Sequence, residues 1–142
     1  MARTQGTVAA GVSDEHLVVD ACALVDLLLG NGLSAAVQAR INGVVLHAPA
    51  HVDAEVLSGL GRLHRSGRLT APVVTHQLAA IAAAPILRHA LPDLIRGAWE
   101  RRSRIRLADA LYVELAHRLG VRMLTTDRAL ARTTKVAEAV TA

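Results

Sequence analysis

Short apolar segments alternate with longer helical segments along the chain, and this alternation constrains the possible folds more than any other feature. The helical segments carry apolar residues at spacings of three and four, and several of them end at glycine or asparagine. The candidate strands are residues 16–20, 44–47, 85–88, 121–124 and 136–140. Strands that alternate with helices favour a parallel sheet with helices on both faces. We therefore predict an α/β fold, a three-layer α/β/α sandwich around a central, mainly parallel sheet of four or five strands.

The 142 residues fit one domain, which we place at residues 16–142, after a flexible lead-in over residues 1–15. Just over half of the residues are apolar, but the chain has no phenylalanine, one tryptophan and one tyrosine. We therefore expect a core of small aliphatic side chains. Because nucleobases stack on aromatic rings, the composition argues against single-strand nucleic-acid binding by stacking.

Positive charge is concentrated in the second half of the chain. Residues 1–61 contain two arginines and six acids, a net charge of −4, whereas residues 62–142 contain thirteen arginines, one lysine and six acids, a net charge of +8. The densest group is opposed only by Glu100 and consists of Arg96, Arg101, Arg102, Arg104 and Arg106. Such a run is either a solvated helix face or a phosphate-binding surface. Its end lies three residues before Asp109, and this proximity to an acid favours phosphate binding.

Cysteine and histidine usage excludes several kinds of site. One cysteine, Cys22, allows no internal disulfide and no cysteine-based zinc site. The seven histidines are scattered, and none occupies a convincing catalytic position. We recognise no signal peptide, and no apolar run approaches the ~20 residues of a membrane-spanning helix. We therefore expect a cytoplasmic protein without a membrane segment.

Four carboxylates occupy positions that are typical of a ligand-binding site and not of a hydrophobic core. Asp20 follows the first candidate strand, Asp127 follows the strand at 121–124, Asp109 opens the helical segment at 107–119, and Glu55 lies in the second turn of a long helix. Strand ends and helix starts gather at one edge of an open α/β sheet, where ligands bind. Each aspartate alone is explained as a helix cap worth ~1 kcal/mol. Glu55 alone is explained as a solvent-exposed helix residue. Only the four acids taken together therefore indicate a ligand-binding site.

The segments around these acids resemble those of PIN-domain ribonucleases in order and spacing. Residues 18–25 (VVDACALV) are similar to the opening strand and helix of that family, and residues 48–56 (APAHVDAEV) to its second acidic motif. Residues 109–113 (DALYV) and 124–131 (LTTDRALA) are similar to its two later motifs. The resemblance covers residues 16 to about 140 and is strongest to the VapC-type toxins of bacterial toxin–antitoxin pairs. It implies a PIN-like fold and an endoribonuclease that acts as a toxin.

The resemblance also implies a metal site. Its catalytic, Mg²⁺- or Mn²⁺-binding residues would be Asp20, Glu55, Asp109 and Asp127, supported by Thr125 and by Asp26 nearby. Unit charges ~4 Å apart repel by about 4 kcal/mol at an effective dielectric of 20, so converging carboxylates need a counter-charge. Hard divalent cations supply that charge and can activate a water towards a phosphodiester. The RNA backbone would be held by Arg101, Arg102, Arg104 and Arg106.

Two positions depart from the family pattern, and two partners are implied. Cys22 stands where serine or threonine is usual, which puts a hydroxyl contact near the metal in doubt, and Ala108 replaces a bulkier residue. The implied partners are a cognate VapB-type antitoxin and, besides the RNA substrate, a second copy of the chain in a homodimer. Apolar helix positions that could serve such contacts lie at 27–29, 60–63 and 78–81.

Three other readings of the acids remain open. A receiver-like phosphoacceptor domain would need an acidic pair at the first strand, and a haloacid-dehalogenase-like phosphatase would need Asp-x-Asp where the chain has Asp20-Ala21-Cys22. Both patterns are missing. A catalytically degenerate PIN domain that binds RNA or protein without cutting is the third reading, and the presence of all four acids disfavours it.

Overall fold

The computed structural model describes residues 15–142, which contain five strands and seven helices. The strands are β1 (His16–Val19), β2 (Val45–Pro49), β3 (Ile86–His89), β4 (Arg122–Thr125) and β5 (Ala137–Ala139). The helices are α1 (Ala21–Leu29), α2 (Ser34–Ile41), α3 (Val52–Arg65), α4 (Ala71–Ala83), α5 (Pro92–Glu100), α6 (Leu107–Leu119) and α7 (Arg128–Thr133). Every predicted segment is present, with ends shifted by at most a few residues. Apart from Glu15, the predicted lead-in lies outside the described residues.

The five strands form one fully parallel sheet in the order β3-β2-β1-β4-β5. The chain starts at the centre with β1, adds β2 and β3 on one side, and then crosses to add β4 and β5 on the other. β1 and β4 are therefore neighbours at the point where the strand order reverses. In open α/β sheets, ligands bind beyond the carboxyl ends of the strands at this switch point.

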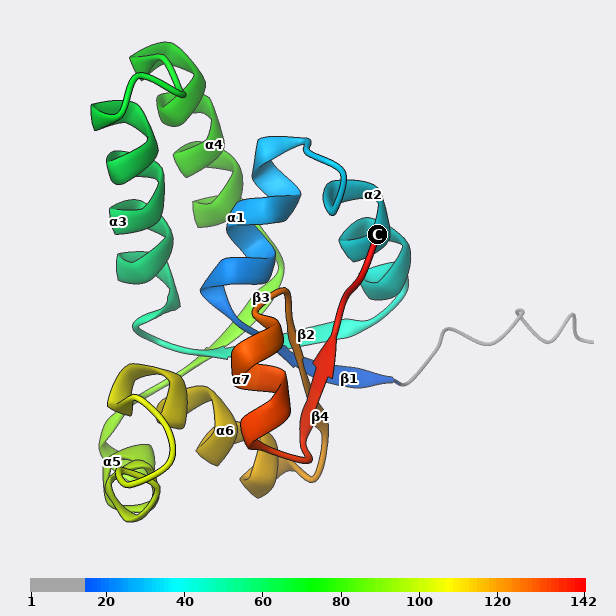
Figure 1. The fold of residues 1–142 in the computed structure, drawn as a ribbon, viewed down its shortest axis with the longest axis vertical. Coiled ribbons are helices and arrows are strands. Elements are labelled where there is room, and N and C mark those ends of the chain that lie inside the picture. Colours follow the sequence, from blue (N-terminus) through cyan, green and yellow to red (C-terminus); the bar gives the residue numbers. More distant parts are fainter. Residues whose placement is uncertain (1–14) are drawn as a thin grey trace, which may run out of the picture.

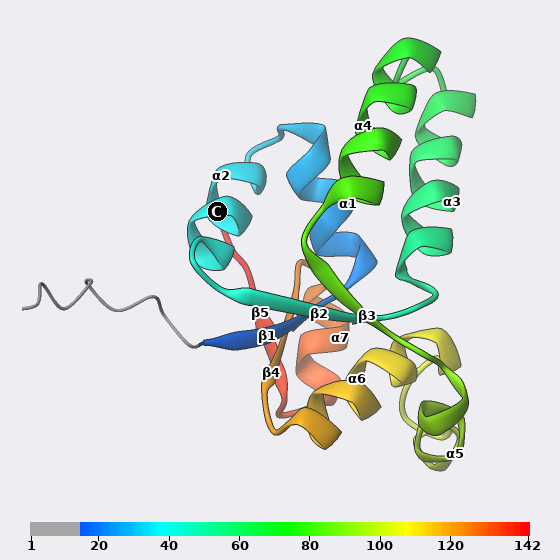
Figure 2. The same cartoon turned by 180° about the vertical axis from the view of Figure 1, so that it is seen from behind.

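Helices cover both faces of the sheet, as predicted for a three-layer sandwich. Figures 1 and 2 show α1 to α4 on one side and α5 and α6 on the other, with α3 and α4 packed as a pair that extends away from the sheet. α7 packs beside β4 and β5. No single helix in residues 15–142 is long and apolar enough to cross a membrane. α1 and α2 reach that length and composition only jointly, and they are bent by 118° at the break between them.

The core consists of small aliphatic side chains, as the composition predicted. The central strand β1 contributes Leu17, Val18 and Val19, all at most 1% exposed, and Met123 and Leu124 of β4 are equally buried. Full burial of such a side chain contributes about 1.5–3 kcal/mol, so the two central strands form a rigid base for the residues that follow them. The one tyrosine of the chain, Tyr112, is also fully buried.

A buried ion cluster joins α5 to α6. The carboxylate of Glu114 is hydrogen-bonded by Arg101 at 2.5 Å and by Arg118 at 2.9 Å, and its side chain is only 9% exposed. The carboxylate fits against α5 because residue 97 is glycine, and a Cβ atom there would overlap it. A buried carboxylate needs such partners, because an unpaired buried charge is strongly destabilising.

This packing predicts opposite effects for two glycine substitutions. Gly97→Ala should destabilise the protein by about 1–3 kcal/mol, since the new methyl group overpacks the site of Glu114. Gly61→Ala is the matched control, because its nearest side-chain atom, Nη1 of Arg65, lies at an ordinary 3.6 Å. Alanine in that helix interior should stabilise by about 0.5–1 kcal/mol. Urea denaturation followed by circular dichroism measures both, and shifts of the same sign would contradict the packing account.

Three histidines form a hydrogen-bonded chain across adjacent strands. Nδ1 of His16 lies 2.8 Å from Nε2 of His47, and Nδ1 of His47 lies 2.9 Å from Nε2 of His89. His47 is buried in the middle of this chain, and burial together with the neighbouring His89 and His16 lowers its pKa. Two N–H···N bonds need only neutral rings, since neutral His47 donates from one ring nitrogen and accepts at the other.

The lowered pKa of His47 predicts a pH-dependent stability. Because the folded state disfavours protonation, the stability due to neutral His47 is present above the ordinary histidine pKa of about 6.5 and is lost as the pH falls below it. His47→Leu places an uncharged, apolar side chain of similar size there, so protonation of residue 47 no longer contributes. Denaturant titrations at pH 7.5 and pH 5.5 should show a smaller loss of stability for the variant than for the parent. Equal losses would show that His47 does not carry the effect.

Candidate active site

Asp20 is the most buried of the four predicted acids. It follows β1 directly, is 3% exposed, and caps α1 by accepting a hydrogen bond from the backbone N–H of Ala23 at 2.9 Å. Burial, together with the negative charges of Asp109 and Asp127, raises its pKa to about 7 against the opposing effect of its hydrogen bonds. The cap role expected from the sequence is therefore present, and a site role for the same residue stays a prediction.

Thr125 and Asp127 join Asp20 from the neighbouring strand. The hydroxyl of Thr125 is fully buried and donates to Oδ2 of Asp20 at 2.5 Å, while it accepts from the backbone N–H of Asp127 at 3.0 Å. Asp127 caps α7 through Oδ1, which accepts from the N–H groups of Ala129 and Leu130. The parallel register of β1 and β4 brings these residues together, because Val19 pairs with Leu124. The supporting position predicted for Thr125 agrees with this geometry.

Glu55 lies in the first turn of α3, not in the second as the sequence suggested, because the helix starts at Val52. Its carboxylate accepts a hydrogen bond from the buried hydroxyl of Tyr112 at 2.7 Å. Burial and the contact with Glu55 raise the pKa of Tyr112 far above its usual range, so this hydroxyl remains protonated and can donate. The helix start and the tyrosine therefore hold Glu55 toward α6.

Sequence reasoning missed the contribution of His51. Its Nε2 lies 3.3 Å from Glu55 and 3.0 Å from the carbonyl oxygen of Ala108, and its ring packs against Tyr112 with centroids 4.7 Å apart. The sequence indicates no histidine in a convincing catalytic position, and the structure places His51 next to Glu55. The spacing of four residues between His51 and Glu55 on one helix was the signal that could have found it.

Arg106 bridges two of the acids. Its guanidinium bonds Asp109 at 3.2 and 3.3 Å and lies 3.9 Å from Glu55. The hydrogen bond and charge of Asp109 raise the pKa of Arg106, which therefore remains a cation. Arg106 was predicted to contact RNA, and in this arrangement it first supplies counter-charge to the acids. Its guanidinium is 72% exposed and thus still faces solvent.

A cleft of about 330 Å³ between α1 and α3 reaches these acids. Glu55 and Arg106 line it together with Cys22, Asp26 and Arg62. Partial burial of its sulfur, with the charges of Asp20, Asp127, Asp109 and Asp26, raises the pKa of Cys22 to about 12. The group at this position is therefore a neutral thiol. Asp26 borders the cleft as expected, and its Oδ1 accepts from the side chain of Asn31 at 3.0 Å.

The carboxylates share one edge of the sheet without forming a closed ligand set. Within residues 15–142, no group of three or more His, Cys, Asp or Glu side chains converges closely enough to hold a metal ion. The hydrogen bonds explain this: Asp20 faces Thr125, Asp127 faces its own helix, and Arg106 lies against Asp109 and Glu55. The donor atoms nevertheless suit a hard divalent cation, since they are carboxylate oxygens and one hydroxyl. The raised pKa values of Asp20 and Cys22 are due first to burial and only second to the negative charge of the neighbouring acids, a charge that a cation would offset.

The arginine run divides into different environments. Arg101 was predicted to contact RNA, but it is bonded to buried Glu114 and to the carbonyl oxygen of Gly97, so it holds α5 to α6 instead. Arg102, Arg104 and Arg106 are exposed. The guanidinium of Arg102 lies over the ring of Trp99, 4.6 Å from its centroid. Three of the four arginines predicted to contact RNA are therefore exposed, and of these Arg106 also contacts Asp109 and Glu55.

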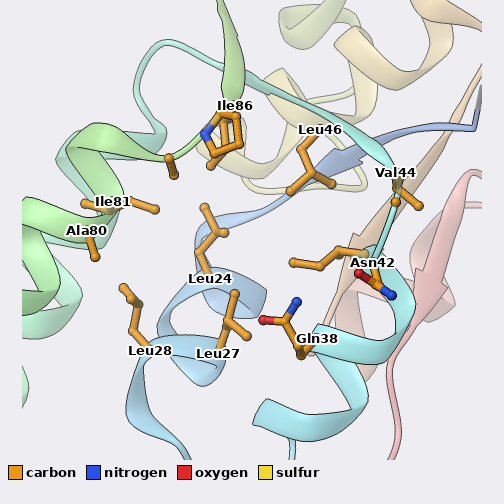
Figure 3. Close-up of a pocket in the computed structure, with 14 residues that line it drawn as sticks. Leu24, Leu27, Leu28, Gln38, Asn42, Val44, Leu46, Ala80, Ile81 and Ile86 are labelled. Atoms are coloured by element: carbon orange, nitrogen blue, oxygen red, sulfur yellow. The ribbon is translucent and has the colours of Figure 1, made fainter. Parts of the chain in front are cut away.

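An apolar groove of about 440 Å³ lies on another side of α1 (Figure 3). Leu24, Leu27 and Leu28 of α1 face Leu46, Ile81 and Ile86 across it, and Gln38 and Asn42 stand at one end. None of the four predicted acids lines it, and it shares no residue with the cleft that Glu55 and Arg106 line. Of the helix positions expected to serve partner contacts, Leu60 and Ile81 are buried, whereas residues 27–29 are half-buried.

Comparison with known proteins identifies the family. A sequence model of the PIN domain matches residues 17–136. Ribonuclease VapC3 of Mycobacterium tuberculosis is 50% identical over 127 residues, which cover 89% of this chain and 93% of that protein.

Two solved structures share the fold. One is a toxin–antitoxin complex from Klebsiella pneumoniae, with a TM-score of 0.63, 14% identity, and coverage of 86% of this chain and 95% of the other. The second is VapC20 of Mycobacterium tuberculosis, a toxin that cleaves the sarcin–ricin loop, with a TM-score of 0.62, 18% identity, and coverage of 82% and 93%. At these low identities the two structures show a common fold only. The family is shown by the sequence matches to the PIN-domain model and to VapC3. The chain therefore belongs to the PIN-domain family, among the VapC-type ribonucleases.

Proposed function

We propose that the protein is a metal-dependent endoribonuclease that acts as the toxin of a toxin–antitoxin pair and hydrolyses RNA phosphodiester bonds. The observation that carries this proposal is the burial of Asp20 at the end of β1 near the charges of Asp109 and Asp127, with Arg106 linking Asp109 to Glu55, in a chain half identical to ribonuclease VapC3. Neither a single cap nor a surface acid explains why Asp20 is buried next to Asp109 and Asp127.

In this proposal, Asp20 and Asp109 hold Mg²⁺ or Mn²⁺, and Glu55 and Asp127 complete the site directly or through water. A bound divalent ion supplies a polarised water at neutral pH and positive charge for the leaving oxygen. The ion would take up carboxylate groups of Asp109 and Glu55 that Arg106 contacts in this structure. The exposed guanidinium of Arg106 would then be free to bind phosphate.

Neighbouring side chains orient the acids. Thr125 turns one oxygen of Asp20 toward β4 and leaves the other at the cap of α1. Tyr112 fixes one oxygen of Glu55, and its neutral hydroxyl adds no further negative charge. Exposed Arg102, Arg104 and Arg106 provide the phosphate contacts of the RNA backbone, so binding should weaken with salt.

The proposed partners are a cognate VapB-type antitoxin and a second copy of this chain. The toxin–antitoxin complex among the structural neighbours and the VapC relatives support an antitoxin. The apolar groove of Figure 3 and the exposed apolar side chains of Leu57 on α3 and Val73 on α4 offer surface for such contacts. We place the protein in the cytoplasm, where its RNA substrate is found.

One observation favours the alternative, a PIN domain that binds RNA or protein without cutting. Arg106 already neutralises Asp109 and Glu55, and a permanent bridge there would leave too few ligands for a metal ion. The retention of all four acids and of the Thr125 and Tyr112 contacts supports the enzyme instead.

Asp20→Asn should reduce RNA cleavage by on the order of 10²–10³-fold, the loss seen when one group that stabilises developing charge is removed. Asparagine can still cap α1 and bond Thr125, so the fold should persist. The matched control is Asp53→Asn, because Asp53 lies on α3 near Glu55 but is paired with Arg88. Cleavage of a labelled RNA and thermal melts test both variants. The assignment fails if Asp20→Asn cleaves as fast as the parent.

Chelation separates the enzyme from the pure binder. EDTA should stop cleavage, and Mn²⁺ or Mg²⁺ added in excess should restore it, since the carboxylates need the ion for their function. RNA binding, measured by filter retention, should persist in EDTA through the arginines. Undiminished cleavage in EDTA would contradict metal dependence, and binding without cleavage under any of these ions would favour the degenerate domain.

A further inference from the structure

The one tryptophan of the chain lies on the surface. Trp99 is 55% exposed in the last turn of α5, whereas Tyr112, the one tyrosine of the chain, is buried in the core. Ile95, one turn earlier, and Leu107 at the start of α6 are exposed beside it. These residues, with Ala98, Ala108 and Leu111, line a shallow apolar hollow of about 220 Å³.

The hollow borders the acidic site. Leu107 and Ala108 in the first turn of α6 line it, and the next residue, Asp109, belongs to the acids. The residue before Leu107 is Arg106, which contacts Asp109 and Glu55. The carbonyl oxygen of Ala108 also bonds His51 on the side of Glu55. The hollow and the acids thus lie on two sides of one helical turn, separated by about one helix diameter of 10–12 Å.

The surroundings of the hollow are cationic. Arg102 lies over the Trp99 ring at 4.6 Å, and Arg96, Arg104 and Arg106 are exposed on the same segment. Glu100, the acid between them, is within 4.0 Å of Arg96. Aromatic rings accept nucleobases by stacking, and arginines bind the adjoining phosphates and stack on bases themselves. A ring under a guanidinium, next to further arginines, suits one nucleotide of a single strand.

We propose that Trp99 is a stacking platform for an unpaired nucleobase of the RNA, at a nucleotide that flanks the cleaved bond. The proposal rests on the proposed ribonuclease function and adds a specificity-determining contact to it. Arg102 covers the ring in the absence of RNA and moves to the neighbouring phosphate or onto the base when RNA binds. The composition argument against stacking holds for a run of bases, because there is one ring, but it does not hold for a single base.

The competing occupant of the hollow is a second copy of the chain. A twofold contact through the same patch would bury Arg102, which lies over the Trp99 ring, in both copies. Like charges that face each other across an interface are unfavourable, whereas a polyanion neutralises them. The charge around the hollow therefore favours RNA over a second copy.

Tryptophan fluorescence tests the platform directly, because Trp99 is the sole tryptophan. The intact chain is titrated in EDTA, so that the RNA is not cut, with a mixed-sequence single-stranded RNA 12-mer and, in parallel, with inorganic polyphosphate. RNA should quench the emission, and polyphosphate, which has no bases, should bind without comparable quenching. RNA that fails to bind, or that binds without quenching, overturns the proposal.

Variants then measure the contribution of the ring. Trp99→Ala should weaken binding of the fluorescently labelled 12-mer by about 5- to 100-fold, the range for loss of one base–aromatic contact, and leave polyphosphate affinity unchanged. Trp99→Tyr should retain most of the affinity, whereas Ile95→Ala, the control in the same hollow, should change it little. An unchanged RNA affinity in Trp99→Ala contradicts the platform. So does a shift from dimer to monomer in sedimentation without loss of RNA binding, which would assign the hollow to a second copy.

Failure of this proposal is distinguishable from failure of the proposed function. If the parent cleaves RNA with Mn²⁺ but shows no quenching in EDTA, the ribonuclease stands and the platform falls. If RNA quenches the emission but no ion supports cleavage, the platform stands in a protein that binds RNA without cutting it.

Discussion

A carboxylate buried at the end of the central strand is the constraint around which this structure is organised. Asp20 must be taken out of water to follow β1 into the sheet, and its burial raises its pKa to about 7. The cost of that burial is offset locally by the N–H of Ala23 and the hydroxyl of Thr125. Since Asp109 and Asp127 add negative charge instead of relieving it, the site retains a demand for a cation.

In the proposed mechanism, two kinds of cation can balance this negative charge, and they compete. The guanidinium of Arg106 lies against Asp109 and Glu55 in this structure, and a divalent ion would need the same oxygens. An arginine is a weaker counter-charge than a divalent ion, but it is attached to the chain and keeps the acids paired when no ion is bound. This exchange gives Arg106 two roles in the proposed mechanism, first as a partner of the acids and then as a partner of phosphate.

The remaining arginines serve structure or substrate according to what lies beneath them. Arg101 reaches the buried carboxylate of Glu114 and joins α5 to α6, whereas its neighbour Arg102 points outward over Trp99. The ion cluster at Glu114 thereby fixes the turn that presents the exposed arginines and the indole. A charge run that looks uniform along the chain is divided by packing into an internal brace and an external surface.

Much of the fold was readable from the sequence, because strand and helix signals are local. Alternating short apolar and periodic segments predicted all five strands, and the order of the acidic motifs predicted the family. Pairing between residues far apart remained open: that Tyr112 would orient Glu55, that His51 would join it, and that Arg101 would be internal. These contacts depend on how α3, α5 and α6 pack, which no local pattern encodes.

The sequence by itself therefore determined the elements, their parallel arrangement and the identity of four acids. Only the tertiary structure decided which oxygen each neighbour would bind, because hydrogen bonds and burial depend on distances between segments that are adjacent only after folding. Trp99 is a further example. The sequence shows one tryptophan, but its exposed position next to the start of α6 depends on how α5 packs against α6.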